Sequence, residues 1–178
     1  AGNVTIDTIG NVYVGSDLSG TVTSRSQAPD IEVTVASIGV VTVYATFAND
    51  TVSAYIAGNA NVTGSRVDVI ANASGTAEAI AEQPNTSVSA VSAAEIYAEA
   101  RVLSRTVTAY IGRDAAVISI GTAADDGVNV AAVSQTVLDA SSGHKSGTNI
   151  TLVGVGRYTI KTYVGTHSTT AEINGTVK

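Results

Sequence analysis

Apolar and polar residues alternate with a period of two along much of this chain, and this pattern limits it to folds built from strands. In residues 41–47, Val, Ala or Phe occupies every second position, and Thr or Tyr fills the positions between. Successive side chains of a strand point to opposite faces, so the pattern predicts strands with one buried and one exposed face. Similar runs lie at residues 3–14, 31–35, 67–72, 128–132, 150–152 and 173–177.

Clusters of turn-forming residues separate these runs. They lie at residues 15–20, 28–30, 57–59, 83–85, 125–127 and 141–147. Short strands divided by turns that contain Gly, Pro, Asn or Asp are typical of all-β domains. We therefore expect an all-β fold. It is either an antiparallel β-sandwich of the Ig-like or jelly-roll kind or, as the alternative, a right-handed parallel β-helix.

An internal repeat predicts a strand where local composition favours a helix. Residues 92–103 begin with a Ser-x-x-Glu capping box and are rich in Ala and Glu, which are good helix formers. However, Thr51–Ile56 recurs as Thr106–Ile111, 55 residues later. Extending this alignment backwards sets residues 96–102 against the strand-like run 41–47. We therefore expect a strand at 96–102.

A looser third copy of the repeat is Thr159–Val164, 53 residues after the second. Such copies indicate duplication of a supersecondary unit. Because the three copies are unequal, they fit a set of similar hairpins in one sandwich as well as they fit a solenoid.

The composition restricts both the core and the partners. The chain has one Phe and no Cys, Met or Trp, so Val, Ile and Ala must fill the interior. Without cysteine it has neither a disulfide nor a thiolate zinc site. Charged residues make up 13%, the net charge is −6, and the nine Lys and Arg residues are scattered, which excludes a basic stripe for nucleic acid. No apolar run approaches the ~18 residues needed to span a membrane.

Seven of the ten asparagines begin an Asn-x-Ser/Thr triplet, the acceptor sequence for N-linked glycans. They are Asn3, Asn49, Asn61, Asn72, Asn85, Asn149 and Asn174. Glycans at these sites predict an extracellular, cell-surface protein, and the opening Ala-Gly-Asn is typical of a mature end after cleavage or of an excised fragment. The alternative is that Asn, Ser and Thr share exposed strand faces, which generates the triplets without any glycan.

Residues that could carry catalysis or bind a metal are few. His144 and His167 lie in polar, loop-like surroundings, and there is no G-x-S-x-G nucleophile elbow. Neighbouring carboxylates occur at Glu78 and Glu82, Glu95 and Glu99, and Asp125 and Asp126. Solvated charges explain these better than a glycosidase pair does. The turn at 125–129 offers oxygen ligands to Ca²⁺ but lacks EF-hand spacing. We expect no enzyme activity and no cofactor, although a sugar-binding module that uses the tyrosines stays open as a third function.

The repeated segment resembles a known class of surface proteins. Residues 51–63, TVSAYIAGNANVT, and their echo at 106–118, TVTAYIGRDAAVI, resemble repeats of large secreted bacterial filamentous adhesins. That resemblance implies a right-handed parallel β-helix with a role in reach and attachment. It covers about a third of the chain, and its motifs are dominated by small and β-branched residues.

A second resemblance concerns the whole profile. A short, cysteine-free, all-β chain rich in glycan acceptor sites is similar to thread-type archaeal extracellular filament subunits. That resemblance implies an N-terminal donor strand at residues 1–15, a sandwich domain at residues 16–178, and a head-to-tail homopolymer of identical chains. Five residues would form the donor strand, namely Val4, Ile6, Gly10, Val12 and Val14. The alternative is that residues 3–14 form an ordinary first strand of the chain's own domain. A neighbour's strand would satisfy both the unpaired backbone groups and the apolar slot of an incomplete sandwich. A glycosylated structural filament is therefore the leading prediction, and the adhesin segment is the alternative.

Overall fold

The computed structural model describes residues 3–26, 31–82, 86–143 and 149–178, and these residues form strands and no helix. The all-β prediction is therefore confirmed. The strands are β1 (Val4–Asp7), β2 (Val12–Ser26), β3 (Ile31–Ile56), β4 (Ala60–Gly64), β5 (Arg66–Glu82), β6 (Thr86–Ile111), β7 (Ala116–Ser119), β8 (Gly127–Gly143), β9 (Asn149–Ile173) and β10 (Thr176–Val177). In the described part of the chain no helix is long and apolar enough to cross a membrane.

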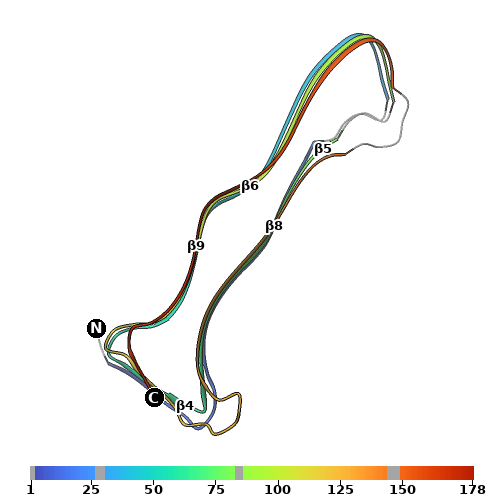
Figure 1. Ribbon diagram of the computed structural model, residues 1–178. Coiled ribbons are helices and arrows are strands. Elements are labelled where there is room, and N and C mark those ends of the chain that lie inside the picture. Colours follow the sequence, from blue (N-terminus) through green and yellow to red (C-terminus); the bar gives the residue numbers. More distant parts are fainter. Residues whose placement is uncertain (1–2, 27–30, 83–85, 144–148) are drawn as a thin grey trace.

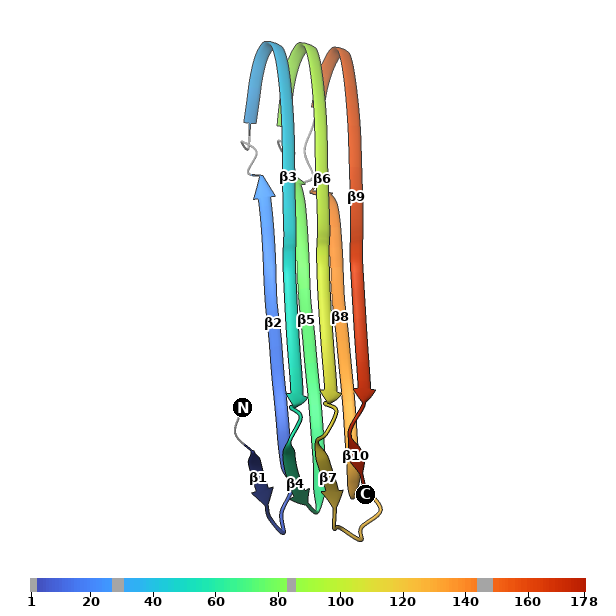
Figure 2. The same cartoon turned by 90° about the vertical axis from the view of Figure 1, so that its left-hand side faces the viewer.

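The chain winds repeatedly through three parallel sheets. Sheet A has the order β1-β4-β7-β10, sheet B has the order β2-β5-β8, and sheet C has the order β3-β6-β9. Each circuit, or coil, therefore adds one strand to each sheet: coil 1 is β1–β3, coil 2 is β4–β6 and coil 3 is β7–β9. Figure 1 looks along the stack, with sheets B and C as two long layers and sheet A at one end, and Figure 2 shows the coils side by side.

Parallel pairing corrects the predicted antiparallel sandwich. The ladders between the described strands are parallel in all three sheets. Alternation with a period of two fixes which face of a strand is buried, but it is the same for both pairing directions. The direction is set by the connections, which return the chain to each sheet after a full coil. The predicted boundary between residues 15 and 16 falls inside β2, and the predicted turn at 15–20 is a continuous part of that strand.

The repeat predicts the alignment of coils 1 and 2 correctly. Thr51–Ile56 of β3 lies beside Thr106–Ile111 of β6, and the predicted strand at 96–102 lies within β6 beside residues 41–47. The third copy was placed wrongly, because Thr106 pairs with Ser168 and not with Thr159. One reason is the length of the connection from β7 to β8, which spans residues 120–126. The equivalent connection in coil 2, from β4 to β5, is Ser65 alone.

A thin core of Val, Ile and Ala fills the space between sheets B and C. In coil 2, Val67, Val69 and Ala71 of β5 are completely buried, as are Val107 and Ala109 of β6. A second cluster lies further along the strands and contains the buried alanines of β5 and β6, from residue 77 to 81 and from 98 to 100. The core is thus built mainly from small aliphatic side chains, as the absence of Trp and Met from the sequence led us to expect.

Candidate functional site

A shared irregularity in sheet C reverses the direction of the side chains halfway along the strands. Ala48, Leu103 and Gly165 are left out of the ladders that join β3, β6 and β9. Before this point odd-numbered residues of β3, such as Ala45, are buried, whereas beyond it even-numbered residues, such as Val52, are buried. The irregularity is a bulge that has the same position in all three coils. It turns two charged residues, Asp50 and Arg105, towards the interior.

Arg105 is a completely buried cation between the sheets. Its Nη2 lies 2.7 Å from Oδ2 of Asp50, and its Nε donates to the same oxygen at 3.2 Å. Its Nη1 donates to Oγ1 of Thr136 at 2.7 Å and to the carbonyl oxygen of Gln135 at 3.3 Å, both on β8. The guanidinium also lies over the ring of Phe47, 5.1 Å from its centroid. All three nitrogens of this buried charge thus donate hydrogen bonds, which offset the cost of burying an ion.

Two glycines of sheet B make room for this centre. Gly20 and Gly75 pair with each other, and Gly75 pairs with Thr136 on its other side. A Cβ added to Gly75 would lie 2.7 Å from Cζ of Phe47 and 3.2 Å from Nη2 of Arg105. We did not predict this polar centre from the sequence. The signal was present, because the two copies of the repeat carry Asp50 and Arg105 at the same position.

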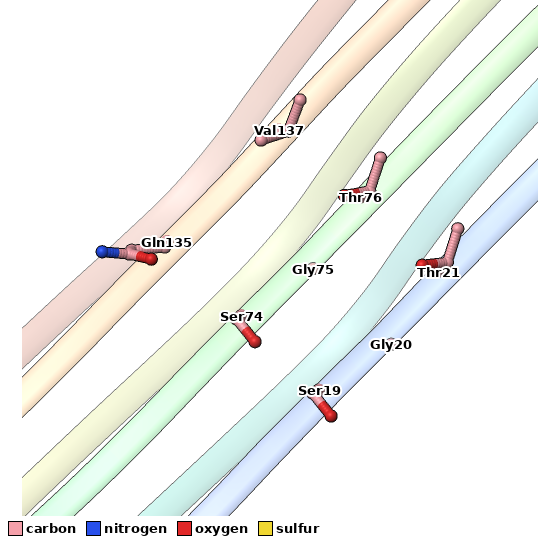
Figure 3. Close-up of a pocket in the computed structure, with 8 residues that line it drawn as sticks. All are labelled: Ser19, Gly20, Thr21, Ser74, Gly75, Thr76, Gln135 and Val137. Carbon is pink, nitrogen blue, oxygen red and sulfur yellow. The ribbon is translucent and has the colours of Figure 1, made fainter.

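The outer face of sheet B is hollowed at the same level. The hollow is lined by Ser19, Gly20, Thr21, Ser74, Gly75, Thr76, Gln135 and Val137. Figure 3 shows the hydroxyl groups on neighbouring strands, with the two glycines between them. Hydroxyl and amide groups can exchange hydrogen bonds with a neutral polar ligand, but the lining contains no acid, base or metal ligand. The chemistry that the lining offers is therefore hydrogen bonding to a polar ligand.

The outer face of sheet C carries stacked aromatic and charged side chains. The rings of Tyr55 and Tyr110 are stacked with their centroids 5.0 Å apart. Arg101 lies 4.6 Å from the centroid of Tyr44, which in turn contacts Tyr97 at 5.5 Å between centroids. The hydroxyl of Tyr97 donates to the carboxylate of Glu99. This bond, with a smaller contribution from burial, raises the pKa of Tyr97 to about 12.

A smaller polar cluster lies on the outer face of sheet B, near its start. Nε and Nη2 of Arg66 donate to Oδ1 of Asp68 at 3.0 and 2.9 Å, and Nδ2 of Asn129 donates to the same oxygen at 3.0 Å. Burial raises the pKa of Asp68, but the hydrogen bonds from Arg66 and Asn129 and the charge of Arg66 outweigh it. The pKa of Asp68 is therefore held below its ordinary value of 3.8.

The predicted glycan acceptors occupy several environments. Asn3, Asn49, Asn61 and Asn174 are exposed, whereas Asn72 is half-buried. The side-chain amide of Asn72 donates to Oδ1 of Asp17 at 2.7 Å, and that of Asn174 donates to Glu172 at 3.0 Å. Asn149 begins β9, and Asn85 lies outside the described residues. Glycosylation of these sites stays a prediction.

The predicted donor residues form the first strands of the chain's own sheets. Val4 and Ile6 lie on β1 beside Ala60 and Val62 of β4. Val12 and Val14 begin β2 and lie beside Val67 and Val69 of β5. Gly10 lies in the connection between β1 and β2, where its carbonyl accepts from the Ser65 amide at 2.9 Å. Their donation to a neighbouring molecule stays a prediction.

The residues considered for catalysis or metal binding have separate surroundings where the structure describes them. Nε2 of His167 lies 2.7 Å from Oγ of Ser134, and His144 lies outside the described residues. Asp126 closes its own turn, accepting from the Ala123 amide at 2.6 Å. Within the described ranges no three His, Cys, Asp or Glu residues are grouped so that they could hold a metal ion.

The remaining carboxylates considered as catalytic pairs have separate partners. Glu78 accepts from Thr23 at 3.4 Å, and Glu82 pairs with Arg25 at 3.4 Å. Glu95 lies 3.8 Å from Arg157, at the limit of an ion pair. These contacts bridge neighbouring coils on the outer faces. Comparison with family models, curated proteins and solved structures finds no match for this chain.

Proposed function

We propose that this chain is a β-helical repeat segment of a secreted surface adhesin, and that its role is reach and attachment. The observation that supports it is the parallel stacking of the coils, with Thr51–Ile56 and Thr106–Ile111 side by side at a spacing of 55 residues. A stack of this kind lengthens by about 4.8 Å for each coil that is added. Its outer faces repeat the same rows of side chains along that length. A right-handed winding of the coils is part of this proposal.

The outer faces supply chemistry suited to attachment. The hydroxyl-lined hollow of sheet B and the tyrosine rows of sheet C are both exposed. Stacked rings and hydroxyl groups are suited to carbohydrate, because they combine apolar faces with hydrogen-bonding edges. Repetition along the stack gives many weak contacts, which together produce strong binding through multivalency.

Surface labelling tests this proposal. An antibody against the exposed β7–β8 connection, residues 120–126, should label intact cells and should decorate thin rods in electron micrographs. Beads coated with the folded chain should adhere to a polysaccharide surface, and a Tyr55→Ser, Tyr110→Ser variant should adhere less. The matched control is Thr5→Ser on sheet A. Labelling confined to the cell interior would contradict the proposal.

A subunit of an extracellular filament is a second candidate, and a specific observation favours it. The side chains of β9 that continue the core rows are open to solvent: Val164 is 58% exposed, although its neighbour Val102 on β6 is completely buried. An uncovered sheet edge of this kind is a template for another chain. Micrographs of the purified chain at increasing concentration test this candidate, since a subunit should form fibres without any other component.

A further inference from the structure

We infer that the edge of coil 3 binds coil 1 of a second copy of this chain, so that β8 pairs with β2 and β9 pairs with β3 of the next molecule. This inference rests on the filament candidate and not on the adhesin proposal. It requires that the edges of coil 3 and coil 1 are apolar, that their strands can pair in one register, and that this register brings no like charges together.

The edge of coil 3 is an unfinished core. Ile160 and Val164 of β9 lie beside the completely buried Ala98 and Val102 of β6, and Ile173 lies beside the buried Ile111. These three β9 side chains are 40%, 58% and 51% exposed. They continue buried rows and lack a neighbour on the far side. A further parallel strand would bury them and would satisfy the free backbone groups of β9.

The bulge of sheet C fixes the register of the joint. It lies at Ala48 in β3, at Leu103 in β6 and at Gly165 in β9, and the ladders align these positions across the three coils. A second copy stacked in the same way sets its own Ala48 beside Gly165. In that register Val164 meets Phe47, and Ser168 meets Thr51. In any other register the bulges would be misaligned, and one set of core side chains would point to the wrong face. Other registers of β9 and β3 are therefore strongly disfavoured.

The polar side chains at this joint are compatible with the proposed register. Asp50, Arg105 and His167 lie at the same level in the three coils and form one row. A second copy places its Asp50 beside His167, which continues the row with an acid. On the outer faces the same register sets Lys161 beside Tyr44, and among the described residues of β8 and β9 it brings no two like charges directly together. Electrostatics thus supports the register that the bulge requires.

Sheet A imposes a condition on the joint. It already has a fourth strand, β10, beside β7, whereas sheets B and C have three strands each. The connection between β1 and β2 is residues 8–11, so β1 of a second copy must lie at the level of its β2. It would then occupy the position of β10. Since β10 consists of two residues and β1 of four, we expect β1 of the second copy to displace it.

Disulfide trapping in this cysteine-free chain tests the register. In the double variant Thr51→Cys, Ser168→Cys, the two cysteines of one molecule are separated by β6, about 9–10 Å apart, beyond the ~7 Å limit for a disulfide. Across the proposed joint they would be about 4.8 Å apart. Oxidation with glutathione disulfide should therefore give covalent ladders of dimers and larger species. Thr51→Cys, Thr166→Cys is the matched control, because it offsets one cysteine by two residues, and it should cross-link at least tenfold more slowly.

The outcomes separate this inference from the adhesin proposal. Equal cross-linking of the two double variants, or monomers in both, would overturn the inference and assign the edge to another occupant. A second measurement uses sedimentation of Val164→Lys, which should reduce self-association, against Ser168→Lys on the outward face, which should not. Circular dichroism must show that both variants are folded. Surface labelling of the natural protein is independent of all these results.

Discussion

The guanidinium of Arg105, a completely buried group, lies 2.7 Å from the carboxylate of Asp50 on the neighbouring strand. The two residues occupy the same position in successive coils, so this ion pair joins coil 1 to coil 2 inside the core. Arg105 also reaches Thr136 across the interior, and the same side chain therefore joins sheet C to sheet B. Arg105 of β6 thus forms hydrogen bonds with both β3 and β8.

Replacing Arg105 by Ala should strongly destabilise the protein. The substitution leaves the carboxylate of Asp50 without its partner and opens a cavity between the sheets, and together these effects should cost about 3 kcal/mol. Arg105→Lys keeps the charge but has fewer hydrogen-bond donors, so it should lose less stability than Arg105→Ala. Urea denaturation measures both changes in the free energy of unfolding. Wild-type stability in Arg105→Ala would show that the pair is not inside the core.

Gly75→Ala should destabilise the protein although it adds only one methyl group. The new Cβ would lie 2.7 Å from Cζ of Phe47, so the ring must move, and overpacking of this kind costs about 1–3 kcal/mol. Gly20→Ala is the matched control, because its Cβ would lie 3.7 Å from the same ring, an ordinary contact. Thermal melting should separate the two variants. Adding Phe47→Leu should restore part of the loss in Gly75→Ala, and failure of this rescue would exclude the steric explanation.

The sequence predicted local structure well because local structure depends on patterns that are visible in it. Residues 96–102 were expected in a strand since they repeat the run 41–47, and the two segments do lie side by side in β6 and β3. Parallel pairing could not be predicted from alternation, because both directions of pairing present the same faces to the core. The register of coil 3 was missed because the longer connection at 120–126 shifts it, and similarity over six residues does not reveal such a shift.

The polar centre was missed for a different reason. Asp50 and Arg105 stand at positions that a strict alternation from Val43 or Ile96 would not place in the core. The bulge at Ala48 and Leu103 changes which residues face inwards, and no Gly or Pro marks it in those two strands. Charges of opposite sign at one repeat position were the available signal. They predict an ion pair only when the coils are known to be parallel, because parallel pairing then sets Asp50 beside Arg105.

The cluster around Asp68 should make stability depend on pH at the acidic end. Its folded-state pKa is held below the ordinary value of 3.8, so the stabilisation is present above that value. It is lost as the pH falls through the lowered folded-state pKa. Because Arg66 is partly exposed, the effect should not exceed about 1 kcal/mol. The difference in melting temperature between wild type and Asp68→Asn should shrink between about pH 6 and pH 2. A constant difference would contradict the assignment.

Tyr97 should ionise at higher pH than an ordinary tyrosine. The hydrogen bond to Glu99 is the main cause that raises its pKa to about 12, and Glu99→Gln should bring the pKa back towards 10. The phenolate absorbance of the seven tyrosines can be followed during alkaline titration. Tyr97→Phe identifies the signal that belongs to this residue. The assignment fails if Glu99→Gln leaves the titration curve of the protein unchanged.

Glycan occupancy should follow the environment of each acceptor asparagine. Asn61 is exposed on β4 and lies between the small residues Thr5 and Ala116, so a glycan there has room to leave the surface. Asn72 is half-buried, and its amide donates to Asp17, which hinders access to the nitrogen that must be glycosylated. Mass spectrometry of protein from its natural source should therefore find Asn61 modified more often than Asn72. Asn61→Gln should remove one glycan mass, and Asn72→Gln should change little beyond the substitution itself. An intact mass of 17.8 kDa for the unsubstituted chain would mean that the triplets reflect exposed strand faces alone.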